Sequence, residues 1–125
     1  MSKSPSPAVS KIAMFAGLSA LAVPAAALAH HGWSSYDAAT VLTIEAPILT
    51  AKYQNPHGEI EVTDKAGKRW QIILAPPSRM ESRGLPRDQL AVGTVATVVG
   101  YPSRVQPAEI RAERIIIAGK TVELR

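Results

Sequence analysis

The residues that could do chemistry are three histidines, two of which follow a sequence that a signal peptidase would cut. Ala27 and Ala29 form the small-x-small pattern that precedes such a cleavage site. Cleavage after Ala29 would make His30 the first residue of the exported chain, with His31 next to it. A terminal amine and the Nδ1 atom of the same histidine can close a chelate ring on a metal ion. The pattern therefore predicts a metal site at the new N-terminus.

His57 is the third histidine and the expected partner of His30 in this site. It lies in the turn over residues 54–58, between two expected strands, from which it could approach the N-terminal arm. An amine and two imidazoles favour copper(II), which prefers tetragonal nitrogen ligation. His31 is an alternative ligand, since a histidine at position two can bind copper through amine, amide and imidazole nitrogens. An outer or axial oxygen could come from Tyr36, Asp37 or Glu59.

Plainer explanations exist for the same three histidines. The peptidase could merely tolerate His30 and His31 after its cut, and the arm that carries them could be disordered. His57 could be a solvated residue, or it could donate a hydrogen bond that fixes its turn. A closed structural zinc site is disfavoured, because four protein ligands are not visible and the sequence has no cysteine.

Residues 1–29 have the composition of a cleaved secretory signal. Lys3 and Lys11 give a positive start, residues 12–23 are uncharged and apolar, and small residues follow Pro24. A membrane anchor is the alternative, but the apolar segment is at the lower limit of a span and is rich in alanine. We therefore expect a mature chain of residues 30–125 in the periplasm or outside the cell.

The mature chain is expected to be one domain, residues 41–125, preceded by an arm over residues 30–40. Two of the fourteen basic residues lie in the signal and all ten acidic residues lie after it, so the mature charge is twelve minus ten, or +2. This balance does not argue for binding to nucleic acid, and we expect no membrane insertion after cleavage. Without cysteine the fold must be held by its core alone.

Most of the mature sequence alternates apolar and polar residues, as β-strands do. A proline, Pro47, should bend the first strand, and Ser78 with Glu81 predicts a capping box for a short helix over 79–83. The expected strands cover residues 41–53, 59–63, 69–75, 94–101 and 109–117, with a short last piece over 121–124. This order favours an all-β fold with one short helix, as a five-stranded OB-like Greek-key barrel. A small sandwich or an SH3-like barrel would also fit.

Several short motifs occur together along the mature chain. They are Ala-His-His-Gly after the signal, the Asn55-Pro56-His57 turn, Trp70, Arg83-Gly84, the turn over 90–93 and the closing segment 112–119. In this combination the sequence resembles a family of small secreted bacterial proteins of unknown function. A serine often stands in that family where this chain has Gly32. The resemblance implies the compartment and the pairing of the two histidine motifs, and it implies no activity.

Three classes of function are compatible with these features. The first is an exported protein that binds copper for storage, delivery or sensing. The second is a non-enzymatic interaction module for a partner protein or small ligand, which would use residues such as Tyr53 or Trp70. The third is a copper oxidase or monooxygenase, which is disfavoured because nothing else in the sequence resembles a set that positions substrate. Glu59 and Glu61 are better explained as a solvated strand face than as a catalytic pair.

Overall fold

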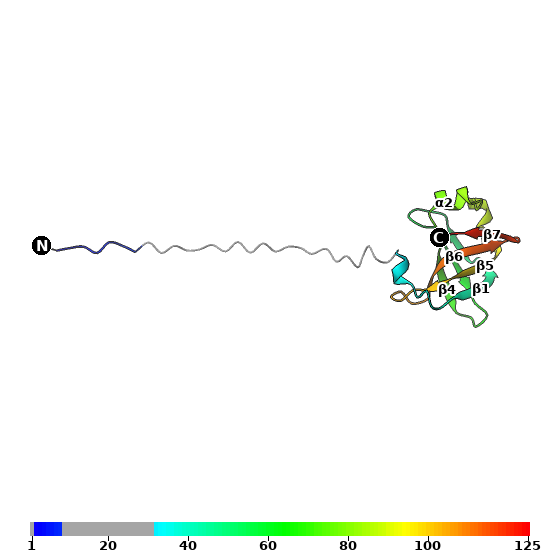
Figure 1. Cartoon of the computed structure of the whole chain (residues 1–125), viewed down its shortest axis with the longest axis horizontal. Helices are drawn as coiled ribbons and strands as arrows, with labels where there is room; N and C mark the ends of the chain where they lie inside the picture. The colour runs from blue at the N-terminus through cyan, green and yellow to red at the C-terminus, as the bar shows by residue number, and fades with distance from the viewer. Residues whose placement is uncertain (1, 9–31) are drawn as a thin grey trace.

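The computed structural model of the chain describes residues 2–8 and 32–125. Most of the expected signal, together with His30 and His31, lies outside these ranges. Figure 1 shows the strands gathered into a small domain, with α2 and the C-terminus at the same side of the sheet. The elements in order are η1 (Trp33–Ser35), β1 (Leu42–Pro47), β2 (Thr50–Lys52), β3 (Glu59–Thr63), β4 (Arg69–Ile73), α2 (Pro77–Ser82), η2 (Arg87–Gln89), β5 (Val95–Pro102), β6 (Glu109–Ile117) and β7 (Lys120–Glu123).

The strands form one sheet whose path runs β1-β5-β6-β4-β3-β2, with β7 paired to β6. Neighbouring strands are antiparallel, except that β4 and β6 run parallel. The connection from β4 to β5 contains α2 and η2. The expectation of a mostly β fold with one short α-helix is therefore confirmed. The prediction of a five-stranded barrel is corrected: the described residues form seven strands in a sheet that is not closed.

The extra strand arises because the first expected strand, residues 41–53, changes partner in its middle. Ile48 donates its N–H to the carbonyl of Thr94 before β5 at 2.9 Å, and Leu49 donates to the carbonyl of Glu61 in β3 at 2.8 Å. Pro47, just before this change, has no N–H to give to a ladder. The segment is thus divided into β1, which pairs with β5, and β2, which pairs with β3.

The core lies on one face of the sheet and follows the predicted alternation. Ile60, Ile72, Leu74 and Ile115 are all completely buried, and Met80 of α2 packs against the same core. Burying side chains of this size stabilises the fold by roughly 1.5–3 kcal/mol each. No disulfide contributes, as the absence of cysteine requires.

The short helix begins differently from the prediction. Its N-cap is Pro76 with Pro77 in the first turn, and no side chain caps it, so the capping box of Ser78 and Glu81 is wrong. Proline suits the first turn because the N–H that it lacks would have no partner within the helix. Gly84 follows with a φ of 86°, a conformation that glycine adopts without strain. Within the described ranges, no helix is long and apolar enough to cross a membrane.

Candidate functional site

The N-terminal arm is fixed to the face of the sheet that is turned away from the core. The ring of Trp33 contacts two guanidinium groups, with its centroid 4.8 Å from Arg111 and 4.6 Å from Arg125. Tyr101 meets the same indole edge to face, with ring centroids 6.2 Å apart. Each contact between a cation and an aromatic ring contributes about 0.5–2 kcal/mol. We call Trp33, Tyr36, Tyr101, Arg111 and Arg125 the arm anchor.

Tyr36 and Arg111 form the buried polar part of the arm anchor. Tyr36 is 2% exposed and donates its hydroxyl hydrogen to Oε1 of Glu109 at 2.6 Å. Arg111 is 3% exposed and hydrogen bonds the same tyrosine. Burial, together with the bond to Glu109, raises the pKa of Tyr36, and burial lowers the pKa of Arg111. The tyrosine is therefore neutral and the arginine charged at neutral pH.

The backbone of the arm is tied to the loop after β5. Asp37 donates its N–H to the carbonyl of Pro102 at 2.9 Å, Arg104 donates to Ser35 at 2.8 Å, and Tyr36 forms a bridge with Ser103. Tyr36 contacts Glu109, and Trp33 contacts Arg111. From Tyr36 back to Trp33, the arm therefore runs alongside β6 from Glu109 towards Arg111. The arm therefore points along β6 as it approaches Gly32, the first described residue after the histidine pair.

His57 lies at the same end of the sheet, two strands away from the arm. Ile73 of β4 pairs with Arg111 on one side and with Glu59 on the other, so these three residues form a row across β6, β4 and β3. His57 precedes Glu59 by two residues. Because β3 runs antiparallel to β4, His57 lies further along the direction in which the arm points.

The turn that carries His57 is fixed by its backbone. Gly58 donates its N–H to Ala75 at 2.9 Å and accepts from Leu74 at 2.8 Å. An added Cβ on Gly58 would come within 2.6 Å of the Met80 side chain, so α2 packs closely on this turn. The Nδ1 atom of His57 is buried, and the residue as a whole is partly exposed. The imidazole is thus partly embedded at a fixed position.

The three expected metal ligands can be placed only in part. His57 is described, while His30 and His31 lie outside the described residues. Within the described ranges there is no group of three or more histidine, cysteine or acidic side chains that could hold a metal ion.

The suggested oxygen ligands are engaged in other contacts. Tyr36 bonds Glu109, and Asp37 accepts from the Thr40 hydroxyl at 2.7 Å. Glu59 accepts from the Gln71 side chain at 3.1 Å. The hydrogen bond from Thr40 is the main cause that lowers the pKa of Asp37. Tyr36 is the most firmly occupied of the three, because its hydroxyl is buried and bonded on both sides.

Tyr53 does not present a binding surface. It is 7% exposed, and its hydroxyl donates to the carbonyl of Leu85 at 2.7 Å. The guanidinium of Arg87 covers its ring at 5.0 Å. Tyr53 therefore joins the end of β2 to the segment after α2, and its role is structural.

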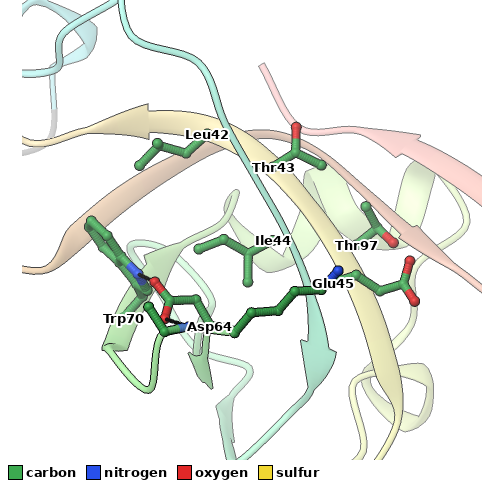
Figure 2. A pocket seen from close by; sticks show the side chains of 9 residues that line it. Leu42, Thr43, Ile44, Glu45, Asp64, Trp70 and Thr97 are labelled. Atoms are coloured by element: carbon green, nitrogen blue, oxygen red, sulfur yellow. Dashed lines mark hydrogen bonds between the residues drawn. The ribbon is translucent and has the colours of Figure 1, made fainter.

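Trp70, the other residue expected in an interaction surface, does line a pocket. The pocket has a volume of about 480 Å³ and lies between β1 and the hairpin that joins β3 to β4. Figure 2 shows Leu42 and Ile44 pointing from β1 towards Trp70, with the indole N–H bonded to Asp64. That bond measures 2.9 Å. We call this pocket the seam groove.

Asp64 holds the hairpin beside the seam groove and predicts a pH dependence. The indole of Trp70, then the N–H groups of Lys68 and Ala66, bond its carboxylate and lower its pKa below 3.8, its ordinary value. A lowered pKa in the folded state means that this stabilisation is complete above 3.8 and is lost as pH falls further.

The variant Asp64→Asn tests this role. The midpoint of thermal unfolding is measured by circular dichroism from about pH 2 to pH 7. Below about pH 4, we expect this midpoint to depend less on pH in the variant than in the unchanged chain. Asparagine keeps the acceptor oxygen without the charge, so the two curves should converge in acid. Curves that stay parallel would contradict the role given to Asp64.

Residues 18–109 match the family model described as a family of unknown function (DUF6152). The match covers all three histidines and runs from the expected signal to the first residue of β6. No curated protein matches the chain.

Proposed function

The chain belongs to this family of unknown function, and from its own residues we propose that it is an exported protein that binds copper(II) at its mature N-terminus. Cleavage after Ala29 would free the amine of His30. That amine and the His30 imidazole would chelate the metal, and His57 would supply the second imidazole. His31 is the alternative donor. Nitrogen ligands in a tetragonal arrangement favour copper(II) over the other common divalent ions.

The observation that carries this proposal is the fixed course of the arm. Trp33 is held by contacts of its ring with the guanidinium groups of Arg111 and Arg125. His30 lies three residues before Trp33 in the sequence, so a fixed Trp33 would limit how far the amine of a mature chain could lie from β6. The arm points along β6 towards the end of the sheet that carries His57. A histidine pair on a freely moving tail would give no reason to expect His57 as a partner.

The distances allowed by chain geometry fit this arrangement. Two strand spacings separate β6 from β3, which is about 10 Å. Two residues from Gly32 to His30 span at most about 7 Å. The side chains of His30 and His57 each extend several ångströms further from the backbone. These lengths are compatible with one metal ion held by the amine, the His30 ring and the His57 ring while the arm anchor stays in place.

The fold that we propose to hold this site is OB-like. Ile48 and Leu49 alone separate β1 from β2, and we infer that the two are halves of one bent strand. Counting them together gives the order β1/β2-β3-β4-β6-β5, with a helix after the third strand and one parallel pair. This agrees with the element order of an OB-type barrel. In it, the arm would lie on the outside of the barrel wall.

The proposal is tested by the N-terminus itself. The full chain is exported with its own signal, its mature start is read from the intact mass, and it is titrated with copper(II). We expect one copper per chain and a mature start at His30. In a second chain, Gly-Ser-Gly is inserted between Ala29 and His30, which moves the free amine away from both histidines. Copper affinity should fall at least tenfold, about 1.4 kcal/mol.

Two substitutions complete the test. His57→Gln should weaken copper binding, whereas Gln54→Ala, an exposed change in the same turn, should leave it unaltered. A further variant, His31→Ala, decides between the second histidine and His57 as the other imidazole donor. Equal affinity of the extended and the unextended chain would rule out the N-terminal chelate.

A further inference from the structure

β1 has one edge that pairs with β5 and an opposite edge, and the ladder decides which backbone N–H and C=O groups point to each. Ile48 bonds Thr94 across the β5 side, and pairing in the antiparallel ladder alternates along the strand. Residues 42, 44 and 46 therefore also bond towards β5, and residues 43 and 45 point to the opposite edge. On that edge Leu49 bonds Glu61 of β3. No backbone partner of Thr43 or Glu45 occurs there among residues 32–125.

The seam groove follows this edge. Four consecutive residues, 42–45, line it, so it is bounded by the strand's edge and by side chains from both faces of the strand. Its floor is apolar and consists of Leu42, Ile44 and Trp70, which project towards one another in Figure 2. Four residues of strand span about 13 Å. The groove thus offers both a backbone edge and an apolar floor over the length of a short extended segment.

The charges beside the groove are unevenly placed, with a carboxylate on the β1 side. Glu45 is exposed on β1, and Asp64 lies at the hairpin with a lowered pKa, so it stays ionised at neutral pH. Lys65 is the cation among the residues that line the groove. The ammonium of Lys68 lies over the Trp70 ring, 3.9 Å from its centroid, so both cations belong to the hairpin side and Glu45 is the carboxylate on the β1 side. In Figure 2, Glu45 points to the side of β1 opposite to Ile44.

We propose that the seam groove binds an extended peptide segment of another protein, which adds a strand to the free edge of β1. Backbone groups of Thr43 and Glu45 would pair with the segment. Alternate side chains of a strand point to opposite faces. One set would be apolar and cover Leu42, Ile44 and Trp70, and the other would be basic and lie beside Glu45. This addition of a strand to a sheet edge is an established mode of peptide recognition.

Pro47 limits the length of the paired segment. It has no N–H to offer, and from Leu49 onwards the edge is already occupied by β3. Pairing is therefore restricted to the part of β1 before Pro47. The partner segment needs only a few residues in extended conformation, which suits an exposed loop or a chain terminus of another protein.

The test uses a five-residue peptide of alternating valine and lysine, acetylated and amidated at its ends, with the full chain. Hydrogen exchange is followed by NMR at each backbone amide. We expect the amides of Thr43 and Glu45 to exchange at least tenfold more slowly when the peptide is saturating. A peptide of alternating valine and glutamate should bind at least tenfold more weakly. Methylation of alternate peptide nitrogens, which leaves every side chain in place, should abolish the protection.

Charge reversal identifies the position of the basic side chains. Glu45→Lys should weaken the lysine peptide at least tenfold and strengthen the glutamate peptide. Glu81→Lys, an equal charge change at an exposed position of α2, should alter neither. No protection of Thr43 and Glu45 at millimolar peptide would overturn the proposal, as would unchanged binding of the methylated peptide. Protection that appears without peptide and grows with protein concentration would mean that a second copy of the chain is the occupant.

Discussion

Replacing Gly100 with alanine is expected to lower the free energy of unfolding by about 3 kcal/mol. An added Cβ would lie 2.3 Å from the carbonyl oxygen of Arg111 and 2.9 Å from the Cα of Ala112. Both atoms belong to the backbone of β6, which cannot move aside as a flexible side chain can. The register between β5 and β6 shifts at Val99 and Gly100, so the two strands approach closely where the bulge occurs.

Gly67 provides the matched comparison for Gly100. It lies in the hairpin between β3 and β4 with a φ of 82°, and an added Cβ there would meet no atom within 4 Å. Gly67→Ala therefore carries only the backbone strain of a positive φ, roughly 1 kcal/mol. Urea unfolding followed by circular dichroism measures both variants. Losses of equal size would show that the close approach of β5 and β6 does not constrain Gly100.

The strands were predictable because the alternation of apolar and polar residues that indicates a strand lies within the strand itself. The alternation over residues 59–63 and 109–117 agrees with β3 and β6 to the residue. The division of the first strand was only partly predictable. Pro47 indicated a bend. The pairing partner of each half, however, is set by β3 and β5, which lie elsewhere in the sequence. The same reason explains why a five-stranded barrel was expected and an open seven-stranded sheet was found.

The helix start and the role of Tyr53 show a second limit. Ser78 and Glu81 have the spacing of a capping box, but Pro76 and Pro77 fix the first turn before the serine can cap it. Tyr53 follows a strand and precedes a turn, a place that suits an exposed aromatic residue. Its burial depends on the segment after α2, whose carbonyl at Leu85 accepts its hydrogen bond.

The candidate site also has a part that the sequence predicts and a part that it does not. The histidines and the cleavage pattern are visible in the sequence, because a chelating N-terminus is a local arrangement. The arm anchor is not visible, since Trp33, Arg111 and Arg125 are far apart in the chain. Arg111 occupies a strand position whose neighbours Ile110 and Ala112 face the core, so alternation alone would put it on a solvated face. In the structure Arg111 is 3% exposed and contacts Trp33 and Tyr36 of the arm.

Arg111→Met should lower the free energy of unfolding by about 3 kcal/mol, because it removes a charged hydrogen bond to Tyr36 and a cation over Trp33. Methionine keeps a similar length without the charge, so the loss reports the guanidinium. Arg114→Met on the same strand removes an exposed pair with Glu123 and should change stability by less than about 1 kcal/mol. Equal losses in the two variants would contradict a special role for Arg111.

A double-mutant cycle with Trp33→Ala separates anchoring of the arm from general packing of the sheet. If Arg111 acts by holding Trp33, the loss in the double variant should be smaller than the sum of the single losses by about 1 kcal/mol. Additive losses would mean that Arg111 stabilises the sheet independently of the arm. The same variants bear on copper. Releasing Trp33 frees the arm without touching any histidine, so Trp33→Ala should weaken copper binding only when the arm directs His30 towards His57. A chelate formed by the first two residues alone would keep its affinity when Trp33 is replaced, because it needs no part of the sheet.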